Sequence, residues 1–145
     1  VCSPEYIKRR GTPLTPQDLA GHEVLRLKTH NSRPRVWRLF NSERQDEVLD
    51  VSVEPGLWVN HTDSLLRATL DGAGIMSTAL ELVAPYLTRG ELVRVLRPWI
   101  AGRLTMYAAL PSRQFIPERS RVFLEYFIER TRGLLASAVK VCDIC

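Results

Sequence analysis

Hydrophobic and polar positions along the chain switch repeatedly between a two-residue period and a helical period. Alternating runs, in which every second residue is apolar, are typical of strands, whereas apolar residues three or four positions apart indicate helices. The runs that predict strands are 22–27, 36–40, 48–53, 57–60, 91–96 and 104–110. The runs and end signals that predict helices are 3–11, 14–21, 62–72, 79–89 and a segment from about 117 onward. Strands that alternate with helices predict an α/β fold with a largely parallel sheet.

Turn and break signals separate these elements. The polar run 41–47 predicts a hairpin turn, which adds an antiparallel pair to the expected sheet. Pro55-Gly56 predicts a break, and 98–103 predicts a loop. With 145 residues the chain is long enough for one domain with a real hydrophobic core, and no internal repeat divides it. The expected architecture is therefore an α/β sandwich.

The segment 57–75 changes abruptly from a strand pattern to a helix pattern. The strand pattern ends at Asn60 and His61, and Thr62 is the expected N-cap of a helix that Gly72 ends. The last two residues of the segment open another strand, so the segment predicts a compact strand–helix–strand unit. In open α/β sheets, ligands bind at the carboxyl ends of strands, where the free N–H groups of helix N-termini favour an anionic or carbonyl group. Asn60, His61 and Thr62 are thus candidate ligand-binding residues. The plainer interpretation, in which Thr62 only caps the helix and His61 is a solvated loop residue, stays open.

Composition narrows the class of protein. Hydrophobic residues make up 45% and charged residues 25% of the chain, which are ordinary values for a globular domain. No run approaches the ~20 apolar residues of a membrane-spanning helix, and we find no signal peptide pattern. The chain begins with Val1 rather than Met, so we expect that a preceding segment is missing.

The net charge of +4 comes from 20 basic and 16 acidic residues that are interspersed along the chain. A nucleic-acid-binding surface usually shows a clustered basic stripe or a reading motif. The densest basic run, 8–10, is short. Solvated positive surfaces are the better interpretation, so we expect no sequence-specific DNA binding by this chain itself.

The three cysteines provide little chemistry. Cys142 and Cys145 form a C-x-x-C pair, which a zinc site would have to complete with two further ligands, and the three histidines show no suitable spacing. Cys2 is expected in the core. An odd number of cysteines favours a reducing compartment, which indicates the cytoplasm. We therefore expect no metal site and no cofactor.

Catalytic motifs are equally scarce. Gly72-Ala73-Gly74 lacks the third glycine of a dinucleotide-binding fingerprint and would close a helix rather than open one. These glycines are better explained by a helix stop and by close packing. No G-x-S-x-G, H-E-x-x-H or P-loop sequence occurs, so no catalytic residue is expected.

Five sequence blocks follow one another in a fixed order. They are VCSPEYIKRRGTPLTPQDLAGHEVLRLK, VWRLF, LWVNHTDSLLRATLDGAGI, LTRGELVRVLRPW and MYAALPSRQFIPERSRVFLEYFIE. Their order and register over about 1–129 resemble the effector-binding domain of LysR-type transcriptional regulators. Ala79 stands where that family usually has a proline, and the tail GLLASAVKVCDIC matches none of its blocks.

The resemblance implies a fold and a domain organisation. It implies a periplasmic-binding-protein-like (type 2) three-layer α/β sandwich, of which this chain holds mainly subdomain II, 1–106. Residues 107–133 would be the crossing strand and closing helix of subdomain I, and 134–145 a C-terminal tail. The family also has a further part of subdomain I and a winged helix-turn-helix domain upstream, and we expect neither in this chain.

The resemblance also implies a function without catalysis. Regulators of this bacterial family bind a small effector in the cleft between two subdomains, and binding changes how a dimer or tetramer holds DNA through its separate DNA-binding domain. By position, the effector-binding residues are Ser3, Pro4, Trp37, Leu39, Asn60, His61 and Thr62. We therefore expect a cytoplasmic homo-oligomer that is not an enzyme. Without the opposite wall of the cleft, this chain should bind its effector poorly.

Two other classes of protein stay open at this point. A stand-alone solute-binding module would share the fold, but it would normally carry a secretion signal. A small cytosolic α/β enzyme would need a catalytic set of residues. The identity of the effector does not follow from the sequence.

Overall fold

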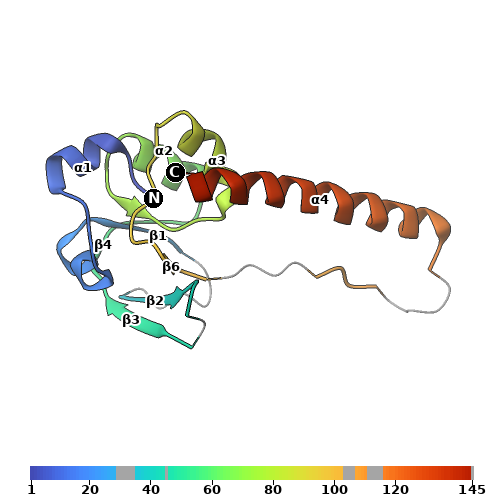
Figure 1. Ribbon diagram of the computed structural model, residues 1–145, viewed down its shortest axis with the longest axis horizontal. Helices are drawn as coiled ribbons and strands as arrows, with labels where there is room; N and C mark the ends of the chain where they lie inside the picture. Colours follow the sequence, from blue (N-terminus) through green and yellow to red (C-terminus); the bar gives the residue numbers. More distant parts are fainter. Residues whose placement is uncertain (29–34, 45, 103–106, 111–115, 145) are drawn as a thin grey trace.

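The computed structural model describes residues 1–28, 35–44, 46–102, 107–110 and 116–144 (Figure 1). In chain order its elements are α1 (Pro4–Arg10), the 3-10 helix η1 (Pro16–Gly21), β1 (Val24–Leu27), β2 (Val36–Asn41), β3 (Val48–Ser52), β4 (Pro55–Val59), α2 (Thr62–Leu70), β5 (Ile75–Met76), α3 (Leu80–Thr88), β6 (Trp99–Ile100) and α4 (Glu118–Ile144). Four strands, β1 to β4, follow one another without a helix between them, and from β4 onward strands and helices alternate as the hydrophobic pattern predicts. Together the elements form an α/β fold.

A parallel three-stranded sheet with the strand order β4-β1-β5 forms the centre of the fold. Leu25 of β1 is level with Leu57 of β4 on one side and with Met76 of β5 on the other. The predicted strand–helix–strand unit is confirmed as β4-α2-β5. Its two strands flank β1 and do not pair with each other, because β1 occupies the place between them.

The first two residues extend this sheet beyond β5. The Val1 amino group donates a hydrogen bond to the Met76 carbonyl oxygen (2.9 Å), and the Met76 N–H donates to the Val1 carbonyl oxygen (2.9 Å). Cys2 forms an antiparallel bridge with Val93 through hydrogen bonds of 2.8 and 3.1 Å. Residues from three distant parts of the sequence thus form one edge of the sheet.

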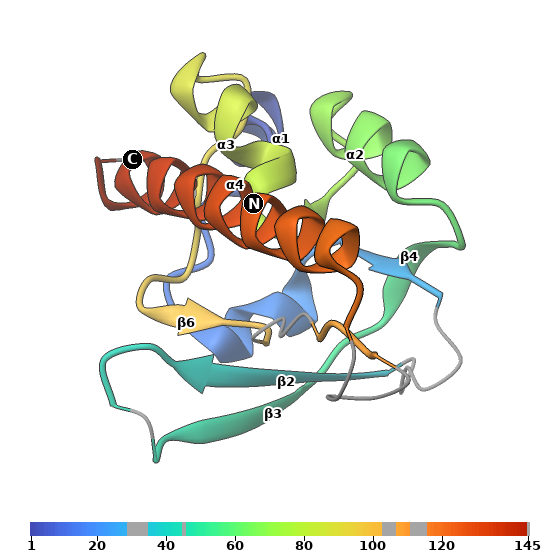
Figure 2. The ribbon, with the colours of Figure 1, turned by 90° about the vertical axis from the view of Figure 1, so that its right-hand side faces the viewer.

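An antiparallel sheet with the order β3-β2-β6 lies on the opposite side of the parallel sheet from α2 and α3 (Figure 2). β2 and β3 pair directly, so the predicted hairpin is confirmed. It belongs to a separate antiparallel sheet, so the expectation that it joins the parallel sheet is wrong. Buried Asn41 fixes its turn, because the side-chain oxygen accepts hydrogen bonds from the N–H groups of Glu43 and Arg44. The Asn41 amide in turn donates to the Glu47 carboxylate (2.7 Å).

Alternation along β1 sends successive side chains into two separate cores. Val24 belongs to a core that also contains Tyr6 of α1 and Trp37 of β2. Leu25 belongs to a second core, which contains Leu65 of α2. The parallel sheet is therefore covered by helices on one face, and on the other it shares a core with the antiparallel sheet.

The helix after β4 begins one residue earlier than predicted. His61 occupies the N-cap position, and no side chain caps α2. The His61 carbonyl oxygen already accepts a hydrogen bond from the N–H of Leu65 (3.2 Å), so Thr62 lies inside the first turn. The predicted capping role of Thr62 is therefore wrong.

Several predicted strands and loops are also wrong. Pro55-Gly56 is the start of β4 and not a break, which is tolerated because proline can begin an edge strand. The run 91–96 contains one isolated bridge in place of a strand, and Leu96 has a left-handed φ of 61°, which ends the extended conformation. The predicted loop 98–103 contains strand β6.

The long helix α4 projects from the body of the fold (Figure 1). Its carboxyl-terminal part packs against α3 and buries Ala138, whereas its amino-terminal part extends away from the sheets. The helix continues into 134–144, which the resemblance assigned to a tail. The predicted strand 104–110 lies partly outside the described residues, and 107–110 has no regular secondary structure. Among the described helices, none is long and apolar enough to cross a membrane.

Candidate functional site

The carboxyl edge of the parallel sheet carries three polar residues where β4 is followed by α2. Asn60 and His61 are exposed, and Thr62 is half-buried. Within the described part of the chain, none of these three side chains forms a hydrogen bond with the protein. Because no side chain caps α2, the N–H groups of its first turn and the positive end of its dipole remain available at this edge. The edge can therefore donate hydrogen bonds to a small molecule.

Ser3 and Pro4 lie at the other end of α2. Ser3 is buried and caps α1, where its hydroxyl accepts a hydrogen bond from the N–H of Tyr6 (3.2 Å), and Pro4 is the first residue of that helix. A Cβ atom on Gly72, just after α2, would lie 3.5 Å from the Ser3 hydroxyl. Since α2 has 9 residues, its ends are about 13 Å apart. The structure therefore does not bring Ser3 and Pro4 together with residues 60–62.

Trp37 and Leu39 are core residues of β2. Both are buried in the cluster that contains Tyr6 and Val24. Their apolar surface stabilises the packing of β2 and leaves little area for a ligand. An effector contact by either residue stays a prediction.

The sequence pattern did not predict a row of cationic and aromatic side chains at the carboxyl ends of β1 and β4. Arg26 of β1 is level with Trp58 of β4 across the sheet. The Arg26 guanidinium carbon lies 5.6 Å from the centre of the Trp37 ring, and the Lys28 ammonium nitrogen lies 5.9 Å from the centre of the Trp58 ring. We call Arg26, Lys28 and Trp58 the cation–aromatic row. The alternation in VLRLK places both cations on one face, but only the strand register shows that an indole lies beside them.

Tyr6, His22 and Glu23 form a hydrogen-bonded node at the start of β1. The Tyr6 hydroxyl accepts a hydrogen bond from the backbone N–H of Glu23 (2.9 Å). The same hydroxyl lies 3.0 Å from His22 Nδ1, and it can donate its proton to that nitrogen when the imidazole is neutral. Partial burial lowers the pKa of His22, the nearby Arg10 cation lowers it further, and Asp18 acts in the opposite sense.

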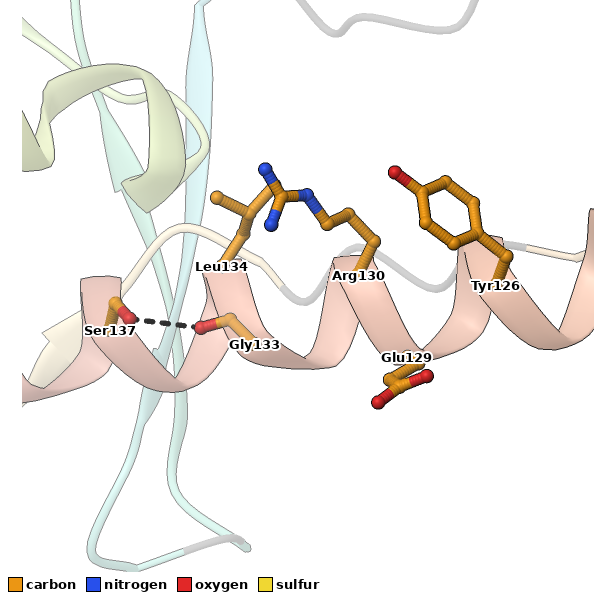
Figure 3. Close-up of a pocket in the computed structure, with 6 residues that line it drawn as sticks. All are labelled: Tyr126, Glu129, Arg130, Gly133, Leu134 and Ser137. Carbon is orange, nitrogen blue, oxygen red and sulfur yellow. Dashed lines mark hydrogen bonds between the residues drawn. The ribbon is translucent and has the colours of Figure 1, made fainter.

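An open groove of ≈ 580 Å³ follows the outer face of α4 (Figure 3). In Figure 3, Tyr126, Arg130 and Leu134 project on one side of this helix and Glu129 projects on the other. All six lining residues belong to α4, and they are Tyr126, Glu129, Arg130, Gly133, Leu134 and Ser137. A groove built by a single helix cannot enclose a small molecule, so we interpret it as a packing surface.

The described residues show no metal centre and no reactive thiol. No three His, Cys, Asp or Glu side chains among them gather closely enough to hold a metal ion. Cys2 is buried, and burial raises the pKa of its thiol, which opposes thiolate formation. The side chains of Cys142 and Cys145 lie outside the described part of the structure.

The comparison with protein families identifies the domain. The chain matches the model of the LysR substrate binding domain over residues 1–132. The chain belongs to the LysR substrate-binding-domain family. This LysR domain is 37% identical over 125 residues to the HTH-type transcriptional regulator PtxR of Pseudomonas aeruginosa, a match that covers 86% of the chain and 39% of PtxR. It is 30% identical to the HTH-type transcriptional activator TtdR of Escherichia coli K12, with 86% and 39% coverage.

A third relative changes the interpretation of the tail. The protein named probable HTH-type transcriptional regulator LtrA, from Klebsiella pneumoniae, is 30% identical over 146 residues, which cover 97% of this LysR domain and 45% of LtrA. Most of the tail 133–145, which matched none of the family blocks, is therefore shared with a relative. The domain spans well under two thirds of each of these regulators.

Solved structures of LysR regulatory domains share the fold. The regulatory domain of AphB from Vibrio vulnificus matches with a TM-score of 0.66 and 26% identity, over 89% of this chain and 62% of that one. The CrgA regulatory domain from Neisseria meningitidis matches with a TM-score of 0.65 and 25% identity, over 88% and 61%. These matches confirm the expected periplasmic-binding-protein-like α/β sandwich.

Proposed function

We propose that this LysR domain senses a small effector at the carboxyl edge of the sheet β4-β1-β5. It would act as part of a cytoplasmic transcriptional regulator and would catalyse no reaction. The observation that carries the proposal is the uncapped N-terminus of α2 beside Asn60, His61 and Thr62, whose side chains have no described protein partner. Hydrogen-bonding groups left open at strand ends are those that a ligand uses in open α/β sheets. The names of its relatives, which are transcriptional regulators, support the same function.

The chemistry of this edge favours an anionic metabolite. The first-turn N–H groups of α2 attract a carboxylate or a similar anion, and Asn60 and Thr62 add hydrogen-bond donors. Asp63 in the same turn opposes that charge, so a neutral carbonyl or hydroxyl group is the alternative. In this proposal residues 60–62 contact the effector. The other predicted residues would support the fold, and they are Ser3, Pro4, Trp37 and Leu39.

Replacing Thr62 separates ligand binding from helix stability. Because Thr62 caps nothing, Thr62→Ala should change the free energy of unfolding by less than about 1 kcal/mol, the range of helix propensities. A lost ligand hydrogen bond should weaken effector affinity about tenfold in Thr62→Ala and in Asn60→Ala. The measurement pairs calorimetric titration with the melting temperature, in the regulator that contains this domain and with an effector found by thermal-shift screening.

Ser64→Ala is the matched control, because Ser64 lies in the same turn but on another side of α2. It should keep the parental affinity. If Thr62→Ala and Asn60→Ala also keep the parental affinity, the polar junction does not bind the effector and the proposed site is wrong.

We also propose that the regulator is a homo-oligomer in which another copy of the chain covers the exposed aromatic residues of α4. Phe123 and Tyr126 on this helix are 62% and 63% exposed. Exposed apolar patches of this kind are usually covered by another protein surface. DNA contact would come from a separate helix-turn-helix domain, as the names of the HTH-type relatives suggest.

A further inference from the structure

We propose that the cation–aromatic row selects an effector in which a carboxylate adjoins a flat, unsaturated body. This inference rests on the effector site proposed above and deepens it by naming the class of ligand. The carboxylate would lie between Arg26 and Lys28, and the flat body would stack on the Trp58 indole.

The backbone sets the positions of the row. Arg26 and Lys28 are two residues apart along β1 and its extension, so their side chains leave the same face of the sheet. The Lys28 N–H donates to the Val59 carbonyl oxygen (2.6 Å), which continues the pairing of β1 with β4 beyond Leu27. Trp58 is level with Arg26 on β4. The strand register therefore places two cations and an indole side by side, whatever rotamers they adopt.

The row lies on the face of the sheet that α2 and α3 do not cover. Leu25 points to the core beneath those helices, and Val24 begins the core on the opposite face. Toward the carboxyl end of the strands, the core that contains Val24 gives way to accessible side chains. Arg26 is half-buried, Lys28 is exposed and Trp58 is 41% exposed. A ligand at this edge can reach all three.

Arg26 is held in place as a ligand-binding cation would be. Its guanidinium lies over the Trp37 ring, and its Nη1 donates a hydrogen bond to the Val36 carbonyl oxygen (3.1 Å). Partial burial lowers the pKa of Arg26, but a guanidinium remains charged at neutral pH. Because the group is half-buried, its attraction to a carboxylate is screened less than that of a fully exposed cation.

Core packing and ion pairing within the fold do not explain the positions of Lys28 and Trp58. Arg26 contacts the buried Trp37 ring, whereas Lys28 forms no ion pair with any described residue and rests over the exposed Trp58 indole. A carboxylate would provide the missing counter-charge for Lys28. An indole face favours a flat ring over a puckered one, because stacking needs parallel contact. The row would thus select a ligand by its negative charge, through Arg26 and Lys28, and by its flat shape, through Trp58. We call these the charge filter and the shape filter.

Nuclear magnetic resonance on the 145-residue chain can test both filters with three probes. Nicotinate carries the charge and the flat ring, nicotinamide has the ring without the charge, and cyclohexanecarboxylate has the charge without the flat ring. Nicotinate should shift the indole N–H signal of Trp58 and the Nε–H signal of Arg26. The two other probes should bind about tenfold more weakly, in line with the loss of a charge-assisted contact or of stacking. Trp58→Phe assigns the indole signal.

Variants that remove a single positive charge show which cations contribute to nicotinate binding. Lys28→Gln and Arg26→Gln should each weaken nicotinate binding about tenfold, whereas Lys8→Gln, which removes an exposed cation of α1, should leave it unchanged. Because Arg26 is half-buried, the Arg26→Gln spectrum must first match that of the parent. Lys28 is exposed, so Lys28→Gln tests the charge filter without this concern.

Three results would overturn the inference. They are equal binding of the three probes, unchanged nicotinate affinity in a well-folded Lys28→Gln variant, and no shift of the row at tens of millimolar nicotinate. The inference and the proposed function can fail separately. If an effector depends on Thr62 and Asn60 but not on Lys28, the site stands and the ligand class is wrong. If it depends on none of them, both are wrong.

Discussion

The Tyr6 hydroxyl contacts both the backbone of Glu23 and the ring of His22. It accepts a hydrogen bond from the Glu23 N–H and lies 3.0 Å from His22 Nδ1, to which it can donate its own proton when the imidazole is neutral. A protonated imidazole has no acceptor at Nδ1, so the hydroxyl would have to turn and accept from it. Partial burial and the Arg10 cation oppose protonation as well, and they lower the pKa of His22. The folded state therefore binds this proton more weakly than the unfolded chain does.

His22→Asn should make the stability of the domain less dependent on pH. The pKa of His22 is lower in the folded chain than its ordinary value of 6.5, so the unfolded chain binds more protons below that pH. The His22 contribution to stability is present above about pH 6.5 and is lost as the pH falls through the lower, folded pKa. Asparagine keeps an acceptor near the Nδ1 position but does not titrate. Urea unfolding at about pH 7.5 and about pH 5.5 should show a smaller loss of stability for the variant than for the parent.

His61→Asn is the control for this measurement. His61 is exposed at the start of α2 and its side chain has no described partner, so this variant should lose stability with pH as the parent does. Equal pH dependence of His22→Asn and the parent would show that the Tyr6–His22 contact is insensitive to the protonation of His22.

Single-residue signals were predictable only where they act locally. Ser3 and Pro4 predict the start of α1, and Gly11 predicts its end, because caps are read from neighbours in sequence. The Tyr6–His22 contact joins residues 16 positions apart, and no sequence pattern points to it. The cap of α2 was misplaced because a threonine preference is an average, and here the backbone turns at His61.

Between elements, β1 and β5 approach so closely that Gly74 has no space for a side chain. A Cβ atom at this position would collide with the backbone carbonyl oxygen of Glu23, which also accepts the Ile75 N–H (2.8 Å). The sequence interpretation of Gly74 as a close-packing residue is confirmed. Any side chain here would push β5 away from the central strand.

Gly74→Ala should destabilise the domain by about 1–3 kcal/mol, because a collision with backbone cannot be relieved by a rotamer change. Gly21→Ala is the matched control, since a Cβ atom at Gly21 would meet no atom within 4 Å. Urea unfolding of the two variants beside the parent measures the difference. Equal stability of Gly74→Ala and Gly21→Ala would contradict the packing described for β1 and β5.

Helices and strands were predictable where their formation depends on the local sequence and not on a distant pairing partner. Helix α1, the β2-β3 hairpin and the β4-α2-β5 unit follow from local periodicity and turn residues. The run 91–96 alternates like a strand but finds only Cys2 as a bridge partner, so the pattern lacks the neighbour that a strand needs. Pro55 reads as a break until the strand order shows that β4 is at an edge.

The candidate site was partly predictable for the same reason. The position of residues 60–62 follows from the strand-to-helix junction, which is local. The cation–aromatic row requires the register between β1 and β4, which brings Arg26 beside Trp58. The separation of Ser3 from residues 60–62 requires the direction of α2 in the fold. Tertiary pairing decides both, and periodicity cannot supply it.

On the scale of the whole molecule, α4 is a long helix that packs against the rest of the fold over only part of its length. Its amino-terminal part extends away from the sheets, and the rings of Phe123 and Phe127 stack on its surface with centres 6.0 Å apart. Both aromatic side chains are exposed. Apolar surface of this kind drives association. We therefore expect this chain to form a dimer or a larger assembly at tens of micromolar.

Replacing Phe123 and Phe127 together by serine should weaken that association about tenfold or more, because aromatic residues dominate the binding energy of interfaces. Glu125→Gln, an exposed residue on the opposite side of the same helix and outside the groove, is the control and should change little. Sedimentation velocity over a concentration series distinguishes the species. A clean monomer of the parent at tens of micromolar would contradict the expectation.

During translation, Val1 and Cys2 are synthesised long before the residues with which they pair in the sheet. Val1 pairs with Met76 and Cys2 with Val93, so this edge has nothing to bind while the intervening chain is made. At roughly 5–20 residues per second, that interval lasts several seconds. An unpaired edge is open during this time to a chaperone or to a strand of a neighbouring nascent chain. The sheet closes only after Val93 has left the ribosomal exit tunnel, which makes this domain a late folder on the ribosome.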